Sequence, residues 1–307
     1  MAQCTDLVTV ARYLRFAPQR LYYLIHNKNH LYYEFEIRKL NDPSKTRKIV
    51  SPIKELKGVQ RVILKEILEQ VPISDQAFAY IKGRSVVAAA KNLLGQQNVL
   101  RLDIADFFPT ISDRRVYGLF ASLGFCPKTS WIFAQLSTHN GRLAQGAPTS
   151  PYISNLICRG LDRHLNALAT SWDLRYLRYS DDIYFHGYPT FNSNKLTAYV
   201  EKILRDHGFR MNKSKIRYHG KGIPRNTLGV LTHGRVIQLP RRARKNYRAA
   251  FFKASKNPKW GLENISILSG MAEYYKAIYG SNSTYLEYKN IIKTVRALRL
   301  HDPYFIQ

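Results

Sequence analysis

The chain has 307 residues, with 48 lysines and arginines against 21 aspartates and glutamates, and its formal net charge is +27. Its hydrophobic fraction is 45% and its aromatic fraction is 12%, so the chain has enough apolar residues to bury a core. This composition excludes a disordered basic tail. An acidic small-molecule substrate would not by itself account for so large a positive charge. The charge favours a polyanion, with nucleic acid ahead of an anionic membrane surface.

Membrane insertion and export are both disfavoured. No apolar run approaches the ~20 residues that span a bilayer, and the first residues lack the basic and apolar regions of a signal peptide. Cys4, Cys126 and Cys158 are odd in number and widely spaced, which suits neither a disulfide framework nor a zinc site. We therefore expect a cytoplasmic protein with no membrane partner.

Apolar spacing predicts helices and strands interspersed along the chain, without a regular βαβ repeat, and thus an α+β fold. In chain order the predicted elements are a helix over 55–69, a strand over 98–104, a helix over 150–169 with Ser150 as N-cap, two strands over 174–186 joined by Tyr179-Ser180-Asp181-Asp182, a helix over 195–207 closed at Gly208, a hairpin over 227–239 turning near His233 and Gly234, and mainly helix in the last 60 or so residues.

The positive charge is concentrated between His207 and Leu262. This stretch contains no aspartate or glutamate and fifteen lysines and arginines, interleaved with aromatic residues such as Tyr247, Phe252 and Trp260. A solvated helix face normally mixes both signs, whereas a single-sign block with interspersed rings is typical of a groove for a phosphate backbone. The alternative is an ordinary basic surface, and the charge alone does not separate DNA from RNA or an enzyme from a binding protein.

Three aspartates stand in apolar surroundings. Asp103 lies within the strand predicted over 98–104, and Asp181 and Asp182 are adjacent at the predicted hairpin tip. Adjacent carboxylates raise each other's pKa unless a cation lies between them. Mg²⁺ prefers carboxylate oxygens and substrate phosphates, and two such ions ~3.5–4 Å apart support phosphoryl transfer. The alternative is that Asp-Asp is an ordinary turn sequence.

Five segments, in the right order and spacing over about residues 35–235, resemble the motifs of reverse transcriptases. They are Arg47-Lys48-Ile49 with Pro52, Leu56-Lys57 and Gln60; Leu102-Asp103-Ile104-Ala105-Asp106-Phe107-Phe108-Pro109; Gln145-Gly146-Ala147-Pro148-Thr149-Ser150-Pro151 followed by Asn155; Tyr179-Ser180-Asp181-Asp182; and Gly208-Phe209 with Asn212 and Lys215. The short chain and the Ser-Pro-x-x-Ser-Asn run at 150–155 look most like the bacterial retron-type enzymes.

Two segments depart from the retron pattern. Retron enzymes usually carry Asn-Ala-x-x-His where this sequence has residues 89–93, Ala-Ala-Lys-Asn-Leu. They usually carry Val-Thr-Gly where this sequence has Thr227-Leu228-Gly229. Because these elements help a retron enzyme engage its own noncoding RNA, the chain is either a true retron enzyme or a related defence-associated reverse transcriptase.

The resemblance implies a right-hand polymerase with fingers, palm and thumb, in which an antiparallel palm sheet bears the Tyr-Ser-Asp-Asp hairpin. The implied division is an N-terminal helical extension over 1–30, fingers over 31–101, a palm over 102–232 with a fingers insertion near 113–142, and a thumb over 233–307.

It also implies roles for individual residues. Asp103, Asp181 and Asp182 would be catalytic and, with the carbonyl of Ile104, would bind two Mg²⁺ ions, or Mn²⁺ in their place. Contacts to the nucleotide would come from Arg47, Lys48, Phe108, Gln145, Gly146 and Lys215. Contacts to nucleic acid would come from Arg84, Arg241, Arg242, Arg244, Lys245, Arg248 and Lys253.

Two of these roles have plain alternatives. Phe108 stands at the steric-gate position, where a large ring excludes the 2′-hydroxyl of a nucleotide, but it is alternatively a core aromatic. Lys215 would neutralise the pyrophosphate leaving group, and it is alternatively one more cation of the basic block.

The implied function is RNA-directed DNA synthesis, a nucleotidyltransferase reaction, in a bacterial antiphage defence system of retron type. The implied partners are a structured noncoding RNA, its DNA product, dNTP substrates and a separate effector protein. Two alternatives stay open: a non-retron defence enzyme with unusual templating or priming, and an inactive palm that only binds nucleic acid. The intact aspartates disfavour the inactive palm, and Phe108 disfavours an RNA polymerase.

Overall fold

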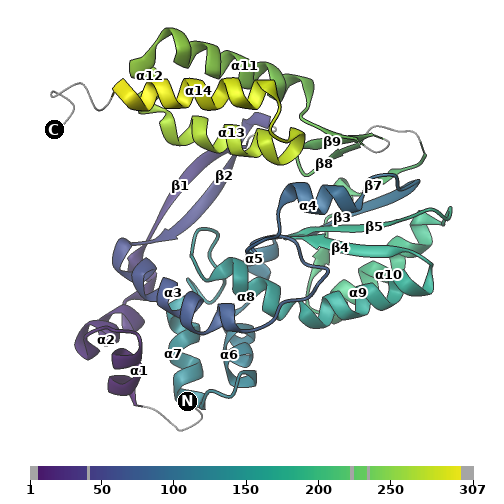
Figure 1. Ribbon diagram of the computed structural model, residues 1–307. Coiled ribbons are helices and arrows are strands. Elements are labelled where there is room, and N and C mark those ends of the chain that lie inside the picture. Colours follow the sequence, from purple (N-terminus) through teal and green to yellow (C-terminus); the bar gives the residue numbers. More distant parts are fainter. Residues whose placement is uncertain (1–5, 40–41, 222–224, 234–235, 299–307) are drawn as a thin grey trace. The chain divides into compact units, whose positions relative to one another are not determined.

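The computed structural model describes residues 6–39, 42–221, 225–233 and 236–298 (Figure 1). The chain forms two compact units. One contains residues 1–86 and 96–221, and the other contains residues 87–95 and 222–307.

The first unit combines helices with a hairpin and a sheet. Its elements are α1 (Leu7–Tyr13), α2 (Pro18–His26), the 3-10 helix η1 (Lys28–Leu31), β1 (Tyr32–Lys39), β2 (Asp42–Pro52), α3 (Lys54–Glu66), η2 (Leu68–Gln70), β3 (Asn98–Ala105), α5 (Phe107–Thr110), α6 (Asp113–Ser122), α7 (Pro127–Ser137), α8 (Ser150–Ile157), α9 (Arg159–Ser171), β4 (Arg175–Tyr179), β5 (Asp182–Gly187), α10 (Ser193–Asp206), β6 (Arg210–Met211), η3 (Lys213–Lys215) and β7 (Arg217–His219).

The main sheet has the order β4-β5-β3-β6, with β7 also paired to β3, and every pairing is antiparallel. Helices α9 and α10 lie together on one side of it (Figure 1). Leu100, Leu102 and Ile104 of β3 are fully buried in the main core. Because side chains alternate along a strand, Arg101 and Asp103 lie on the opposite face of the sheet.

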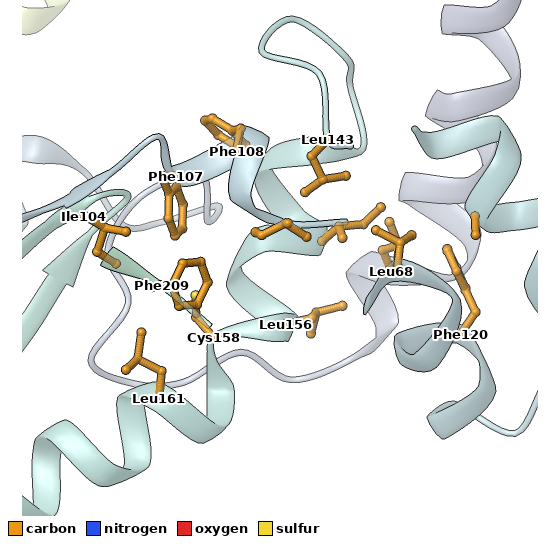
Figure 2. Close-up of a cluster of buried hydrophobic side chains, with 14 of the residues drawn as sticks. Leu68, Ile104, Phe107, Phe108, Phe120, Leu143, Leu156, Cys158, Leu161 and Phe209 are labelled. Atoms are coloured by element: carbon orange, nitrogen blue, oxygen red, sulfur yellow. The ribbon is translucent and has the colours of Figure 1, made fainter. Parts of the chain in front are cut away.

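Aromatic packing anchors the segment that follows β3. The rings of Phe107 and Phe209 stack with their centroids 5.8 Å apart, next to Ile104 and Cys158 (Figure 2). Burial raises the pKa of the Cys158 thiol to about 11, so this thiol is a neutral core group.

The structure confirms the strand over 98–104, the paired strands over 174–186, the helix closed at Gly208 and the helical C-terminal region. The single helix expected over 150–169 is wrong, because α8 and α9 are separate helices that meet at Cys158. Thr149, rather than Ser150, occupies the N-cap position of α8. The apolar stripe continues across the break, so its periodicity gives no sign of it.

The second unit has its own core. Its elements are α4 (Val86–Asn92, with Val86 in the first unit), β8 (Arg225–Thr227), β9 (Val230–His233), β10 (Val236–Gln238), α11 (Arg241–Lys256), α12 (Pro258–Glu263), α13 (Ile265–Tyr279) and α14 (Ser283–Leu298). Helices α11, α13 and α14 lie side by side (Figure 1). Phe251 and Tyr288 stack between α11 and α14 with ring centroids 3.8 Å apart.

Strands β9 and β10 form the hairpin expected over 227–239, and Gly234 of its predicted turn lies outside the described residues. Within the residues that the structure describes, no helix combines the length and the apolar character needed to cross a membrane.

Candidate active site

A strained two-residue turn joins β4 to β5. Tyr179 and Asp182 are paired across the hairpin, with Ser180 and Asp181 between them. Ser180 has φ of 60°, and Asp181 is not in the left-handed region, a combination found in type II′ turns, where glycine is usual at the first position. A serine there costs ~1–3 kcal/mol of strain, which the surrounding structure must hold in place.

The sheet brings the three predicted carboxylates together. Asp103 is directly opposite Asp182 in the β3–β5 pair, and the Ile104 amide donates to the Asp181 carbonyl at 2.9 Å. Burial, and then the charge of Asp103, raise the pKa of Asp181. Burial, and the charges of Asp181 and Asp103, raise the pKa of Asp182 to about 6. Both aspartates of the turn therefore take up a proton more readily than exposed aspartates, chiefly because they are buried.

Two cations contact this group of aspartates. Lys215 Nζ donates to Asp103 Oδ2 at 2.7 Å, and the Asn212 amide, just before η3, donates to the Asp103 carbonyl at 2.8 Å. Arg101 donates through Nε and Nη2 to the two carboxylate oxygens of Asp182, at 2.9 and 3.1 Å. Lys215 was predicted here, and its position supports a role at the site rather than membership of a bland basic surface.

The position of Arg101 beside the aspartates was not predicted, although the strand pattern in the sequence indicates it. Arg101 stands two residues before Asp103 in the same apolar strand, so the alternation that marks Asp103 marks Arg101 equally.

The two phenylalanines after β3 point in different directions. Figure 2 shows Phe107 directed toward Phe209 and Phe108 directed away from it. Phe108 packs instead against Tyr80, with ring centroids 6.2 Å apart. The hydroxyls of Tyr80 and Ser180 are hydrogen-bonded at 2.9 Å. Tyr80 thus links Phe108 to the strained turn, and the sequence alone did not predict this contact.

Gly146 is required by a close approach of strand β2. The Val50 amide donates to the Gln145 carbonyl at 3.1 Å. Gly146 has φ of 144°, and a Cβ there would lie 2.7 Å from the Val50 carbonyl oxygen and 2.9 Å from Ile49 Cγ2. The backbone that comes close to Gly146 is therefore that of the β1–β2 hairpin.

The hairpin sends two neighbouring cations to opposite faces. The charge of Arg47 lowers the pKa of Asp181, partly offsetting the effect of burial, so these groups are within electrostatic reach. Lys48 Nζ instead pairs with an oxygen of Glu34 at 2.6 Å, with both side chains exposed. Adjacent strand residues face opposite sides, so the sheet does not bring Lys48 to the aspartates, and its predicted nucleotide contact gains no support.

Arg84 is occupied within its own loop. One guanidinium nitrogen donates to the carbonyls of Ser74 and Ala77 at 2.7 and 2.6 Å, and the other pairs with Asp75 at 3.2 Å. These contacts favour a structural role for Arg84 over the predicted contact with a template backbone.

The predicted nucleic-acid contacts of the second unit all lie on α11 and are exposed: Arg241, Arg242, Arg244, Lys245, Arg248 and Lys253. Arg241, Lys245 and Arg248 are spaced four and three residues apart and therefore share one face of the helix. The first turn of α11 has no acidic residue, although cations at a helix N-terminus oppose the helix dipole. Such cations are better explained by an anionic partner than by the stability of the helix.

Residues 37–231 match the protein family described as reverse transcriptase (RNA-dependent DNA polymerase). The chain belongs to the reverse transcriptase family.

Named relatives narrow the assignment to the retron type. The chain is 31% identical to the retron Mx162 reverse transcriptase of Myxococcus xanthus, over 74% of this chain and 54% of that protein. It is 30% identical to the retron Mx65 enzyme of the same organism, over 76% and 58%, and 28% identical to the retron Ec86 enzyme of Escherichia coli, over 80% and 76%. These matches confirm the predicted retron-type resemblance, and the chain spans a little over half the length of the two Myxococcus relatives.

Reverse transcriptase domains generally use divalent metal ions, usually Mg²⁺. In the described part of the chain, no three His, Cys, Asp or Glu residues are gathered closely enough to form a ready metal cluster. The donors nevertheless fit a hard cation, because Asp103, Asp181 and Asp182 offer carboxylate oxygens and two of them have raised pKa values. Arg101 and Lys215 supply part of the positive charge in this arrangement.

Proposed function

We propose that this reverse transcriptase synthesises DNA on an RNA template by transferring nucleotides from dNTPs to a primer 3′-hydroxyl. The proposal rests above all on the meeting of Asp103 with Asp181 and Asp182 across β3 and β5, in a chain that belongs to this family. Two Mg²⁺ ions held by these carboxylates and the Ile104 carbonyl would activate the attacking oxygen and stabilise the leaving group.

The chain's own residues supply the remaining functions. Lys215 and Arg47 place positive charge beside the aspartates, where the triphosphate would gain negative charge in the transition state. Phe108 would lie against the sugar and exclude a 2′-hydroxyl. Gln145 and Gly146 would support the incoming nucleotide through the backbone that β2 holds in place.

We assign fingers to residues 31–101, palm to 102–232 and thumb to 233–307, with a helical extension before them. The assignment is supported by the position of the carboxylates on the central strands of the main sheet, and by the exposed basic face of α11, which would contact duplex phosphates.

We further propose a retron setting, with a structured noncoding RNA as template, a DNA product and a separate effector protein in antiphage defence. The similarity to the retron Mx162 and Ec86 reverse transcriptases supports the retron setting. The competing proposal is a non-retron defence enzyme with unusual templating or priming. It is favoured by residues 89–93, which stand where retron enzymes usually carry Asn-Ala-x-x-His. Of these residues, Ala89, Ala90 and Leu93 are buried.

The test is to purify the chain from cells, sequence the nucleic acid that accompanies it, and assay primer extension on that RNA with dNTPs and Mg²⁺. The retron proposal expects a branched RNA–DNA hybrid and template-dependent extension. Repetitive or unattached DNA would favour the competing proposal. Absence of any dNTP incorporation would contradict the polymerase function itself.

A further inference from the structure

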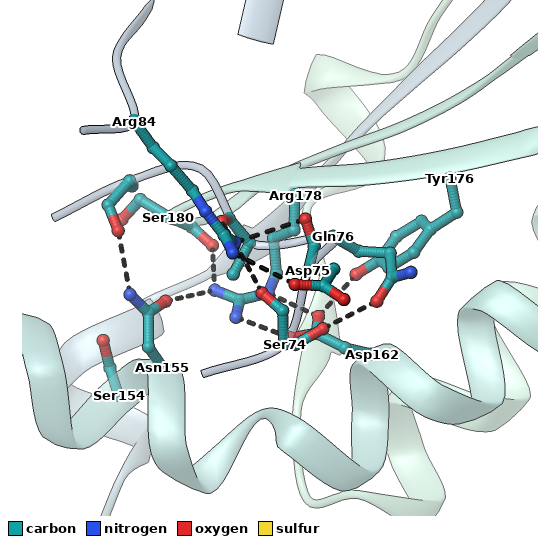
Figure 3. A network of polar contacts seen from close by, with 12 residues as sticks. Ser74, Asp75, Gln76, Arg84, Ser154, Asn155, Asp162, Tyr176, Arg178 and Ser180 are labelled. Atoms are coloured by element: carbon teal, nitrogen blue, oxygen red, sulfur yellow. Dashed lines mark hydrogen bonds and ion pairs between the residues drawn. The ribbon is translucent and has the colours of Figure 1, made fainter. Parts of the chain in front are cut away.

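An ion pair without solvent exposure lies directly behind the strained turn. The side chains of Arg178 on β4 and Asp162 on α9 both have 0% exposure. Arg178 Nε donates to Asp162 Oδ1 at 2.7 Å and Nη2 donates to Oδ2 at 2.9 Å, while the Tyr176 hydroxyl donates to Oδ1 at 2.8 Å (Figure 3). Asp162 is thus bound by three donors and fixes the plane of the guanidinium.

The remaining guanidinium nitrogen points to the turn. Arg178 Nη1 donates to the Ser180 carbonyl and to Asn155 Oδ1, both at 3.1 Å. Asn155 itself donates to the Ala79 carbonyl at 2.8 Å. The carbonyl that Arg178 binds belongs to the residue with positive φ and immediately precedes Asp181.

The backbone of Arg178 is fixed as well. Its amide donates to the Gln76 carbonyl at 2.8 Å, and its carbonyl accepts from the Phe78 amide at 2.8 Å. Tyr80, two residues further along, is hydrogen-bonded through its hydroxyl to the Ser180 hydroxyl. The segment 76–80 therefore contacts the turn on the side-chain hydroxyl of Ser180, while Arg178 contacts it on the carbonyl.

Stability alone is a weak explanation for this pair. Desolvation of two buried charges commonly offsets their attraction, and well-packed apolar residues often replace such a pair without loss of stability. Apolar side chains would not, however, bind the Ser180 carbonyl. Lysine would also fall short, because only the planar fork of arginine holds a carboxylate with two nitrogens and still directs a third elsewhere.

We propose that Arg178, held by Asp162 and Asn155, is a positioning residue that fixes the Ser180 carbonyl and thereby aims the Asp181 carboxylate at the metal ions. Its contact with the turn carries this step, because Ser180 is strained and lies next to Asp181 in the chain. The inference rests on the proposed function of Asp181.

The test separates positioning from stability with a paired replacement. In Arg178→Met/Asp162→Leu both charges are removed together, so no uncompensated charge is left in the core. Its thermal unfolding midpoint is expected to stay near that of the wild type. Its kcat for primer extension is expected to fall about 10–100-fold, with a higher Mg²⁺ concentration at half-maximal rate and little change in the KM for dNTP, as when a partner of a metal ligand is lost.

A matched pair and a conservative variant serve as controls. Arg20 binds Glu55 through two nitrogens, at 2.7 and 2.6 Å, away from the turn, and Arg20→Met/Glu55→Leu should leave kcat and the Mg²⁺ dependence unchanged. Arg178→Lys retains a charge opposite Asp162 without the fork, and it should fold with a kcat as low as that of the paired replacement.

Wild-type kcat and Mg²⁺ dependence in a folded paired replacement, or in Arg178→Lys, would overturn the proposal. Failure of both variants to fold would also overturn it, because the pair would then serve stability. Asp181→Asn, assayed in parallel, distinguishes failure of the proposed function from failure of the positioning role. Full activity of Asp181→Asn would contradict the proposed function. Loss of activity there, beside wild-type behaviour of the Arg178 variants, contradicts only the positioning role.

Discussion

The turn between β4 and β5 and the helix α11 use charge in opposite ways. Around the turn, Asp103 and Asp182 are each bound to a specific cation, and Arg178 behind it has no exposure. On α11 the cations are exposed and share one sign. Buried, hydrogen-bonded charges can position a single chemical group. Exposed cations attract any polyanion, and salt weakens that attraction.

This contrast gives each region its own experimental signature. Removing a charge at the turn should change the rate and leave most of the binding intact. Removing charges from α11 should change salt-dependent binding and leave the chemistry of a bound substrate intact.

The largest effect is expected from Asp181→Asn. Loss of a metal ligand removes stabilisation of several kcal/mol from the transition state, so kcat for primer extension should fall by ~100-fold or more. Because burial and Asp103 raise the pKa of Asp181, the uncharged replacement should not lower the unfolding midpoint measured in EDTA. Asp206→Asn, at the exposed end of α10, is the control and should behave as wild type.

The next effect concerns α11. Replacing Arg241, Lys245 and Arg248 by glutamine should flatten the plot of log affinity for template–primer against log salt by about 3 units, at ~0.9 per phosphate contact. The matched control replaces Lys195, Lys202 and Arg205 of α10, which are equally exposed and remove the same net charge. Equal changes in both triple variants would break the comparison, since the effect would then follow net charge alone.

A smaller effect is expected at the gate. Phe108→Ala should raise the ratio of NTP to dNTP incorporation by about tenfold or more, the size of effect that one pocket contact contributes to discrimination. Phe108→Tyr retains the ring and should keep the wild-type ratio. An unchanged ratio in the alanine variant would assign Phe108 to the core with Phe107.

The smallest effect is expected at Gly146. Alanine there would be strained by a φ of 144° and by contact with the Val50 carbonyl, and it should lower the free energy of unfolding by ~1–3 kcal/mol. Gly118→Ala in helix α6 meets no atom within 4 Å and should raise that free energy by ~0.4–1 kcal/mol. A neutral Gly146→Ala would contradict the close approach of β2.

Side-chain alternation and turn residues in the sequence were sufficient to predict the central strands of the main sheet and the hairpin between them. The alternation around Asp103 predicted β3, and the pair Asp181 and Asp182 predicted the hairpin between β4 and β5. The break at Cys158 was not predictable from periodicity, because the apolar stripe passes through it without interruption.

Contacts between distant segments account for what the sequence did not reveal. Lys48 faces Glu34 because of strand register, and Arg84 is satisfied by carbonyls of its own loop, neither of which a motif match can show. Arg101 and Arg178 were signalled by charges inside apolar strands, but their partners Asp182 and Asp162 are fixed only by the folded sheet and α9.

The central claim is that the three aspartates at the turn hold divalent metal ions, and Mn²⁺ binding followed by electron paramagnetic resonance tests it directly. The wild type should bind Mn²⁺ in competition with Mg²⁺, binding should be lost in Asp103→Asn and in Asp181→Asn, and Asp206→Asn should bind normally. Unchanged Mn²⁺ binding in both Asp103→Asn and Asp181→Asn would contradict the account.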